Sequence, residues 1–176
     1  MVRAVDDGMT SGGAEHLKVP PNSIEAEQSL LGGLMLDHKS WDKIADVVSV
    51  NDFYRKDHAL IFAAIARLAE DSNPCDVVTV SEFLDNRGEL EKAGGLEYLA
   101  TLANETPGAA NARSYAKILR ERSMLRALIT AGNEITGSAF STEGRTAAEL
   151  VDEAERLVFE IAESGSRGRS GFKPLK

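Results

Sequence analysis

Residues 111–140 read NARSYAKILRERSMLRALITAGNEITGSAF, and this stretch contains no proline. Apolar or small residues recur at every seventh position, at Ile118, Leu125, Gly132 and Ala139, and Leu128 and Ile135 occupy positions between them. A seven-residue apolar repeat places these side chains along one side of a helix, where they can pack against another helix. The stretch therefore predicts a single long helix with an apolar stripe.

A second helix is predicted directly after a short break. Glu143–Gly144 interrupts the pattern, and Thr146 and Glu149 follow with the T-x-x-E spacing of a capping box. Apolar residues then alternate by three and four, as in an amphipathic helix, at Ala147, Leu150, Ala154, Leu157 and Ile161. Because the connection is short, the two helices are predicted to form an antiparallel hairpin.

The apolar stripes of this hairpin are wider than a two-helix seam can bury. The residues that we expect to mediate self-association are Ile118, Leu119, Leu125, Leu128, Ile129, Ile135, Leu150, Val151, Leu157, Val158 and Ile161. Leaving half a dozen such side chains in water would forfeit about 10 kcal/mol, which is comparable to the stability of a domain. We expect a second copy of the hairpin to cover them in a four-helix bundle; coverage by the body of the same chain is the alternative.

Residues 22–108 predict a compact helical body in front of the hairpin, so the expected fold class is all-α. Asn22 and Glu25 can cap a first helix that runs to about Asp37. That helix contains Gly32–Gly33, which costs on the order of 1 kcal/mol per residue in a helix interior. We expect close packing by a neighbouring helix to compensate for this cost.

Four further helices are predicted in the body. Ser40 can cap a short one that carries Trp41, Ile44, Val47 and Val48, and residues 61–68 carry a clear amphipathic stripe. Thr79 and Glu82 form a second capping box, and Gly94–Gly95 opens a helix that ends at residues 106–108. Residues 77–80 could also suit a strand, but no partner strand is visible, which favours a helix.

The two ends of the chain differ in composition from the body. Residues 1–21 have the polar, glycine-containing composition of a flexible leader, and residues 165–176 have that of a linker. No signal peptide or membrane span is evident. The single cysteine, Cys75, excludes an intramolecular disulfide, which fits a reducing cytoplasm.

The charge balance disfavours direct binding of nucleic acid. The chain has 20 basic and 28 acidic residues, a formal net charge of −8. Its lysines and arginines are scattered among more numerous acids, whereas a DNA-binding fold normally presents a basic stripe.

The sequence shows no catalytic, cofactor-binding or metal-binding pattern. Neither a P-loop nor a G-x-G-x-x-G motif occurs, and the three histidines lie apart, at His16, His38 and His58. We expect His38 in solvent, His58 at the edge of the core, and Cys75 to be unreactive because no basic neighbour lowers its pKa. The expected function is protein docking, with no catalysis by this segment.

Eight short stretches, in order, resemble the N-terminal domain of DnaB-type bacterial replicative DNA helicases. They begin with PNSIEAEQSLLGG at 21–33 and continue at 52–54, His58, 61–62, 76–80, 94–99, 107–111 and 115–116. The pattern continues through Arg126 of the hairpin, and the likeness as a whole covers roughly residues 20–164.

This resemblance implies a collar domain that works in assembly. In the family, these domains pair through their hairpins into a trimer of dimers above a ring of six ATPase domains, and the primase C-terminal domain and the helicase loader dock there. ATP, Mg²⁺ and DNA would be bound by the ATPase domain beyond the linker, which is absent here. We therefore expect a dimer for this segment and a hexamer for the parent helicase.

Candidate primase contacts are residues 140–145 and 86–92. The alternative to a helicase collar domain is a free-standing adaptor or loader-like protein that mimics this domain.

Overall fold

The computed structural model describes residues 18–166, and helices are the only regular elements in that part of the chain. The α-helices are α1 (Ile24–Leu36), α2 (Trp41–Ile44), α3 (Lys56–Glu70), α4 (Val77–Asn86), α5 (Gly95–Glu105), α6 (Ala112–Phe140) and α7 (Ala147–Ser166). Three 3₁₀ turns, η1 (His38–Ser40), η2 (Val50–Asp52) and η3 (Ala109–Asn111), connect them. The predicted all-α fold class is confirmed.

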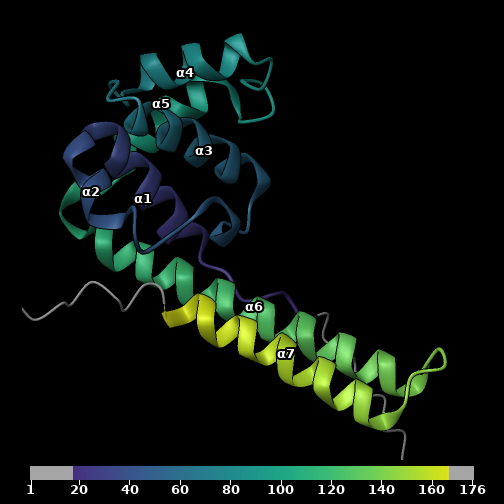
Figure 1. The fold of residues 1–176 in the computed structure, drawn as a ribbon. Helices are drawn as coiled ribbons and strands as arrows, with labels where there is room; N and C mark the ends of the chain where they lie inside the picture. Colours follow the sequence, from purple (N-terminus) through teal and green to yellow (C-terminus); the bar gives the residue numbers. More distant parts are fainter. Residues whose placement is uncertain (1–17, 167–176) are drawn as a thin grey trace, which may run out of the picture.

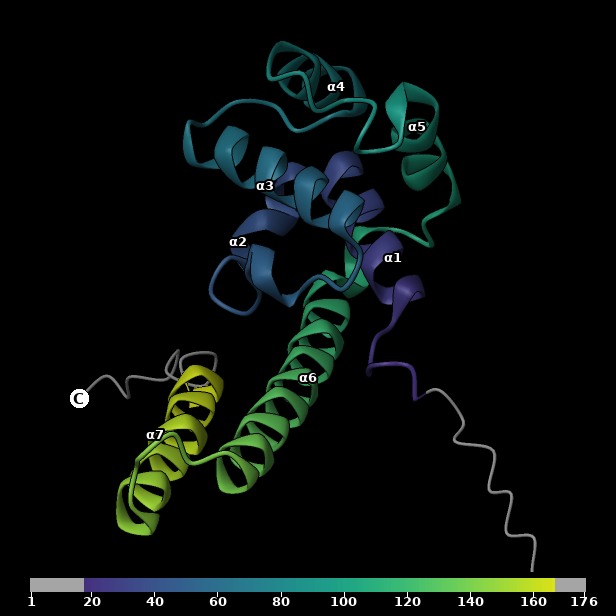
Figure 2. The ribbon, with the colours of Figure 1, turned by 90° about the vertical axis from the view of Figure 1, so that its right-hand side faces the viewer.

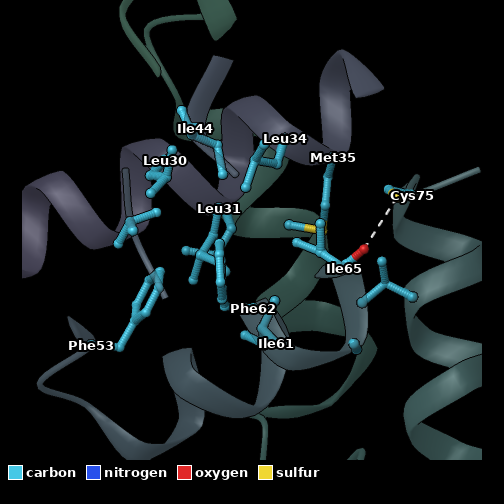
Figure 3. Packing of buried hydrophobic residues seen from close by; sticks show 14 of the residues in the cluster. Leu30, Leu31, Leu34, Met35, Ile44, Phe53, Ile61, Phe62, Ile65 and Cys75 are labelled. Carbon is cyan, nitrogen blue, oxygen red and sulfur yellow. Dashed lines mark hydrogen bonds between the residues drawn. The ribbon is translucent and has the colours of Figure 1, made fainter. Parts of the chain in front are cut away.

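Helix α1 lies at the centre of the body and packs against α3, α5 and α6. Its sequence is apolar on more than one side, so Leu30, Leu31 and Leu34 are all completely buried. They meet Ile61 and Phe62 of α3 in the cluster drawn in Figure 3. A helix that is apolar around most of its circumference is stable only when neighbours surround it, and α3, α5 and the start of α6 supply these neighbours.

The glycine pair of α1 allows a close approach between helices, as predicted. A Cβ atom on Gly32 would lie 2.1 Å from the carbonyl oxygen of Leu102 in α5, and one on Gly33 would lie 3.3 Å from the Cα of Ala109. No side chain fits at the first distance. The loss of helix propensity at Gly32 is thus offset by backbone packing of α1 against α5.

Helix α6 belongs to the body at one end and to the hairpin at the other. Its first turns bury Ala112, Ala116 and Leu119 in the body core. The helix then leaves the body, and α7 returns antiparallel along its side, so that the hairpin projects away from α1–α5 (Figures 1 and 2). The body and the hairpin therefore share one continuous helix.

Two of the expected helix starts are wrong by a few residues. Helix α1 is capped by Ser23, whose Oγ accepts a hydrogen bond from the Ala26 amide at 3.3 Å, and not by Asn22. Helix α4 begins at Val77, three residues before the expected start, because the Asp76 carboxylate accepts from the Thr79 amide at 3.1 Å. Several polar residues near each start can serve as a cap, and the packing of the following helix selects one of them.

The short second helix also differs from the expectation. Ser40 makes no capping hydrogen bond, and α2 ends at Ile44 after a single turn. Val47 lies in the turn that follows and Val48 directly after it, yet both are buried. Burial of these valines fixes the path of the chain here without a longer helix.

His58 is completely buried, so the expected position at the edge of the core is wrong. Its Nε2 lies 2.6 Å from the hydroxyl of Tyr98, and its Nδ1 lies 3.7 Å from a carboxylate oxygen of Glu27. Glu27 is itself 1% exposed and accepts from the amides of Tyr54 and Arg55 at 2.8 and 3.3 Å. This carboxylate of α1 thus satisfies amide groups at the start of α3, where Arg55 supplies no side-chain cap of its own.

Candidate interaction surface

The turn between α6 and α7 is built by local hydrogen bonds. Glu143 and Gly144 both have positive φ angles, 51° and 81°, which reverse the chain. The Thr146 amide donates to Glu149 Oε2 at 2.8 Å, and the Glu149 amide donates to Thr146 Oγ1 at 3.2 Å. The predicted capping box at the start of α7 is therefore confirmed.

Four of the predicted self-association residues lie in the seam between the two helices. Ile135, Leu150, Leu157 and Ile161 are half-buried there. Opposite Leu157 and Ile161 of α7, α6 presents small residues such as Ala127 and Ala131, and an open hollow of about 360 Å³ lies between the helices there. These four side chains already have a partner within the same chain, and the seam accounts for part of each apolar stripe.

Five others remain on the outside of the hairpin. On α6, Leu125, Leu128 and Ile129 are 38%, 47% and 48% exposed; on α7, Val151 and Val158 are 56% and 49% exposed. We call these five residues the outer apolar face. Buried aliphatic side chains contribute about 1.5–3 kcal/mol each, so this face retains a substantial driving force for association with another surface.

The remaining two predicted residues belong to the body. Leu119 is 2% exposed inside the core of its own chain, and Ile118 packs partly buried against that core. Leu119 therefore has no surface to offer a neighbour, contrary to our expectation. The seven-residue repeat placed Ile118 on the apolar side of α6. The repeat alone does not show which part of that side packs inside the body and which part lies in the hairpin.

Two exposed aromatic residues of the hairpin were not among the predicted self-association residues. Phe140, at the end of α6, is 90% exposed, and Phe159 of α7 is 63% exposed. Phe159 falls outside the three-and-four spacing of the α7 stripe, which is why the periodicity missed it. A signal was present nonetheless, because an aromatic residue next to Val158 on an otherwise acidic helix is unusual for a solvated surface.

The two hairpin helices carry opposite charge. Helix α7 has six acidic residues and one arginine, whereas α6 has five basic residues and two acidic ones. Arg145 at the turn bonds Glu153 at 2.7 Å, and Arg156 bonds Glu160 at 2.8 Å within α7. Most of the acidic side chains of α7 are exposed. A partner protein with a basic surface would complement their charge.

An arginine of α6 fastens the hairpin to the body. Arg126 donates from Nη1 to the Pro21 carbonyl at 2.7 Å and from Nη2 to the Asp52 carbonyl at 2.9 Å. Its guanidinium also lies 5.5 Å from the centre of the Tyr54 ring. Sequence patterns gave no sign of this role, because the partners are 74 and 105 residues away along the chain.

The part of the chain between residues 18 and 166 contains neither a metal-binding cluster nor a candidate membrane span. No group of three or more histidine, cysteine or acidic side chains there is placed to hold a metal ion. Cys75 is buried, and burial, together with the neighbouring Asp76 charge, raises the pKa of its thiol. In the same range no helix has the length and apolar character of a membrane span.

Comparison with known proteins identifies close relatives. The chain is 43% identical to the replicative DNA helicase DnaB of Haemophilus influenzae over 155 residues, covering 88% of this chain and 33% of that protein. It is 40% identical to DnaB of Leifsonia xyli over 161 residues, covering 90% of this chain and 34% of that protein. The chain thus spans about a third of the length of these relatives.

Solved structures give the same result. The crystal structure of the N-terminal domain of DnaB helicase from Mycobacterium tuberculosis matches with a TM-score of 0.78 at 38% identity, covering 81% of this chain and 99% of that one. A DnaB-like replicative helicase, described with its interactions with primase, shares the fold with a TM-score of 0.65 at 20% identity, covering 80% of this chain and 31% of that one.

The family assignment rests on the sequence of the body and the first part of α6. Residues 19–121, more than half of the chain, match the family described as the DnaB-like helicase N terminal domain. The resemblance inferred from the sequence motifs is therefore confirmed. This chain belongs to the family of DnaB-like helicase N-terminal domains.

Proposed function

We propose that this chain is a non-catalytic collar domain of a replicative DNA helicase, which assembles with other copies through its hairpin. The observation that carries the proposal is the outer apolar face on α6 and α7. The same chain covers the seam residues but leaves this face exposed. A second hairpin related by a two-fold axis would present the same face in return, which makes the two surfaces self-complementary.

The charges of the hairpin support this pairing. A two-fold arrangement can bring the basic α6 of one copy next to the acidic α7 of the other and repeat the contact on the opposite side. Complementary charge improves the rate and specificity of association more than its affinity. The apolar residues would then supply most of the binding free energy.

Substitution at the centre of the outer apolar face tests the proposal. Leu128→Asp places a charge in the proposed contact and is expected to convert dimers to monomers in sedimentation equilibrium, with a dissociation constant at least about tenfold higher. Asn133→Asp is the matched control, since it adds the same charge at another exposed position of α6. The helical circular dichroism should persist in both variants. A wild-type domain that stays monomeric at every accessible concentration would reject pairing by this segment.

We further propose that primase docks on this domain in the longer helicase. Support comes from the related DnaB-like helicase described with its interactions with primase. The turn at residues 140–145, with exposed Phe140, and the body surface at residues 86–92 are the two candidate contacts. Alanine blocks in each, titrated with the primase C-terminal domain by calorimetry, would distinguish them, and unchanged binding in both would reject the pair.

The remaining functions belong, in this proposal, to the longer protein. Its ATPase domain would bind ATP, Mg²⁺ and DNA and form the hexameric ring, and the helicase loader would engage that assembly in the cytoplasm. The relatives' length, about three times that of the matched segment, supports this division over a free-standing adaptor. A reading frame that continues into a P-loop after residue 176 would support it further, and a stop codon there would favour the adaptor.

A further inference from the structure

One side chain of α6 connects the body with the far end of α7. Arg120 donates from Nη1 to the Asp52 carboxylate at 2.9 Å. From Nη2 it donates to the carbonyl oxygen and to the hydroxyl of Ser164, the latter at 2.6 Å. Its guanidinium therefore bridges η2 of the body and the last turn of α7, which returns toward the body along α6 (Figure 1).

The receiving carboxylate is held rigidly. Asp52 is 3% exposed, and its second oxygen accepts from the Ser49 amide at 2.8 Å. One carboxylate oxygen is thus held within the 3₁₀ turn of the body, and the other accepts from Arg120. A buried, fully bonded carboxylate is a fixed point from which Arg120 can position another element.

Apart from Arg120, the end of α7 meets α6 through half-buried Ile161 and through Gly165, which lies close to the Met124 side chain. No residue of Ala147–Ser166 is buried, although the helix is long and amphipathic. The carbonyl groups of the last helical turn also lack partners within the helix, and an arginine that bonds one of them caps the helix end. Arg120 supplies such a cap to Ser164 while it is anchored on Asp52.

We propose that Arg120 is a positioning residue that latches the end of α7 to Asp52 of the body. Asp52 is also bound by a second arginine of α6. Arg126 donates to the backbone carbonyl of Asp52 and to that of Pro21. Through these two arginines, Asp52 connects Pro21, just before α1, with the end of α7. This inference is independent of the proposed pairing, because all its contacts lie within one copy.

The conservative variant Arg120→Lys separates the latch from simple stabilisation of the fold. An ammonium group can keep the ion pair with buried Asp52, but it lacks the planar fork that reaches Asp52 and Ser164 together. Hydrogen exchange measured by mass spectrometry should show amides at the end of α7, residues 162–166, exchanging about tenfold faster. Amides of α3 and of the first turn of α7 should be unchanged.

Arg113→Lys is the matched control. Arg113 also connects α6 to the body, donating to the Lys43 carbonyl at 3.0 Å, but its bonds do not involve α7. Its substitution should leave exchange at residues 162–166 as in the wild type. Ser164→Ala, which removes only the hydroxyl acceptor, should give a rise smaller than Arg120→Lys.

Two results would overturn the latch. If exchange at the end of α7 is the same in Arg120→Lys and the wild type, Arg120 does not position that end. If α3 and α7 exchange faster to the same extent, Arg120 stabilises the whole fold and has no selective role. The two results are read from the same spectra, so neither depends on assembly or on a partner.

Discussion

Helices α3 and α7 are both amphipathic, but they differ in how far the chain buries them. Helix α3 buries six of its fifteen residues in the body, whereas α7 buries none of its twenty. The difference lies in what surrounds each helix. Helix α3 packs on both α1 and α4, whereas within residues 18–166 α7 packs extensively on α6 alone. A periodic apolar stripe therefore predicts that a helix will be covered, but not whether its own chain covers it.

The largest expected effect tests how tightly the body is packed. Gly32→Ala would bring a methyl group to 2.1 Å from the Leu102 carbonyl, so α1 and α5 must move apart. We expect a loss of about 3 kcal/mol in the free energy of unfolding, measured with urea.

The hairpin supplies the matched control for that variant. Apart from its chain neighbours and the backbone of its own helix, no described atom lies within 4 Å of a Cβ atom built on Gly132 of α6. Gly132→Ala should therefore be neutral or stabilise the protein by up to about 1 kcal/mol, because alanine favours the helix. Equal destabilisation by both variants would contradict the difference in packing between body and hairpin.

A smaller effect is expected from the buried carboxylate that joins α1 to α3. Glu27→Gln removes the charge that accepts the Tyr54 and Arg55 amides, and hydrogen bonds to a charged group contribute about 1.5–3 kcal/mol. The midpoint of thermal unfolding should fall accordingly. Glu25→Gln, at an exposed position of the same helix, should leave it nearly unchanged; an equal fall in both would show that the buried position has no special role.

The smallest effect concerns the edge of the body, at the cap of α4. Hydrogen bonds from the Thr79 amide and hydroxyl hold the pKa of Asp76 below its ordinary value, although partial burial opposes them. Asp76→Ala should cost about 1 kcal/mol at pH 7. A lowered folded-state pKa contributes stability above the unfolded-state pKa and loses it as the pH falls through the folded-state value, so the difference should shrink below about pH 4.

The comparison variant for this cap is Asp85→Ala, exposed near the other end of α4. Urea unfolding at pH 7 and pH 3 would measure both variants. A cost for Asp76→Ala that is the same at the two pH values would show that the carboxylate charge does not contribute to the cap.

Local patterns predicted the helices more reliably than the contacts between them. The capping box at Thr146 and Glu149, the long α6 and the close approach at Gly32 all follow from neighbouring residues or from one residue type. The starts of α1 and α4 were misplaced because adjacent polar residues compete for the same capping role. Tertiary packing decides that competition, and a single sequence does not contain its outcome.

The polar contacts between distant parts of the chain could not be predicted from local sequence patterns. Glu27 meets the start of α3 across 27 residues, and Arg120 meets Asp52 across 68. Charged residues at such separations look like ordinary solvated positions in the sequence. All five residues of the outer apolar face were named from the sequence. The exposure of Phe159 and the burial of Leu119 in the core became evident only from the fold.

The absence of buried side chains in α7 has a consequence for how this molecule can change over time. Val151 and Val158 are about half exposed, whereas Leu31 and Phe62 are buried. A substitution at either valine therefore costs a single copy less folding stability than one at Leu31 or Phe62. The association surface can therefore be retuned, or directed to a new neighbour, while the folded scaffold that presents it stays the same.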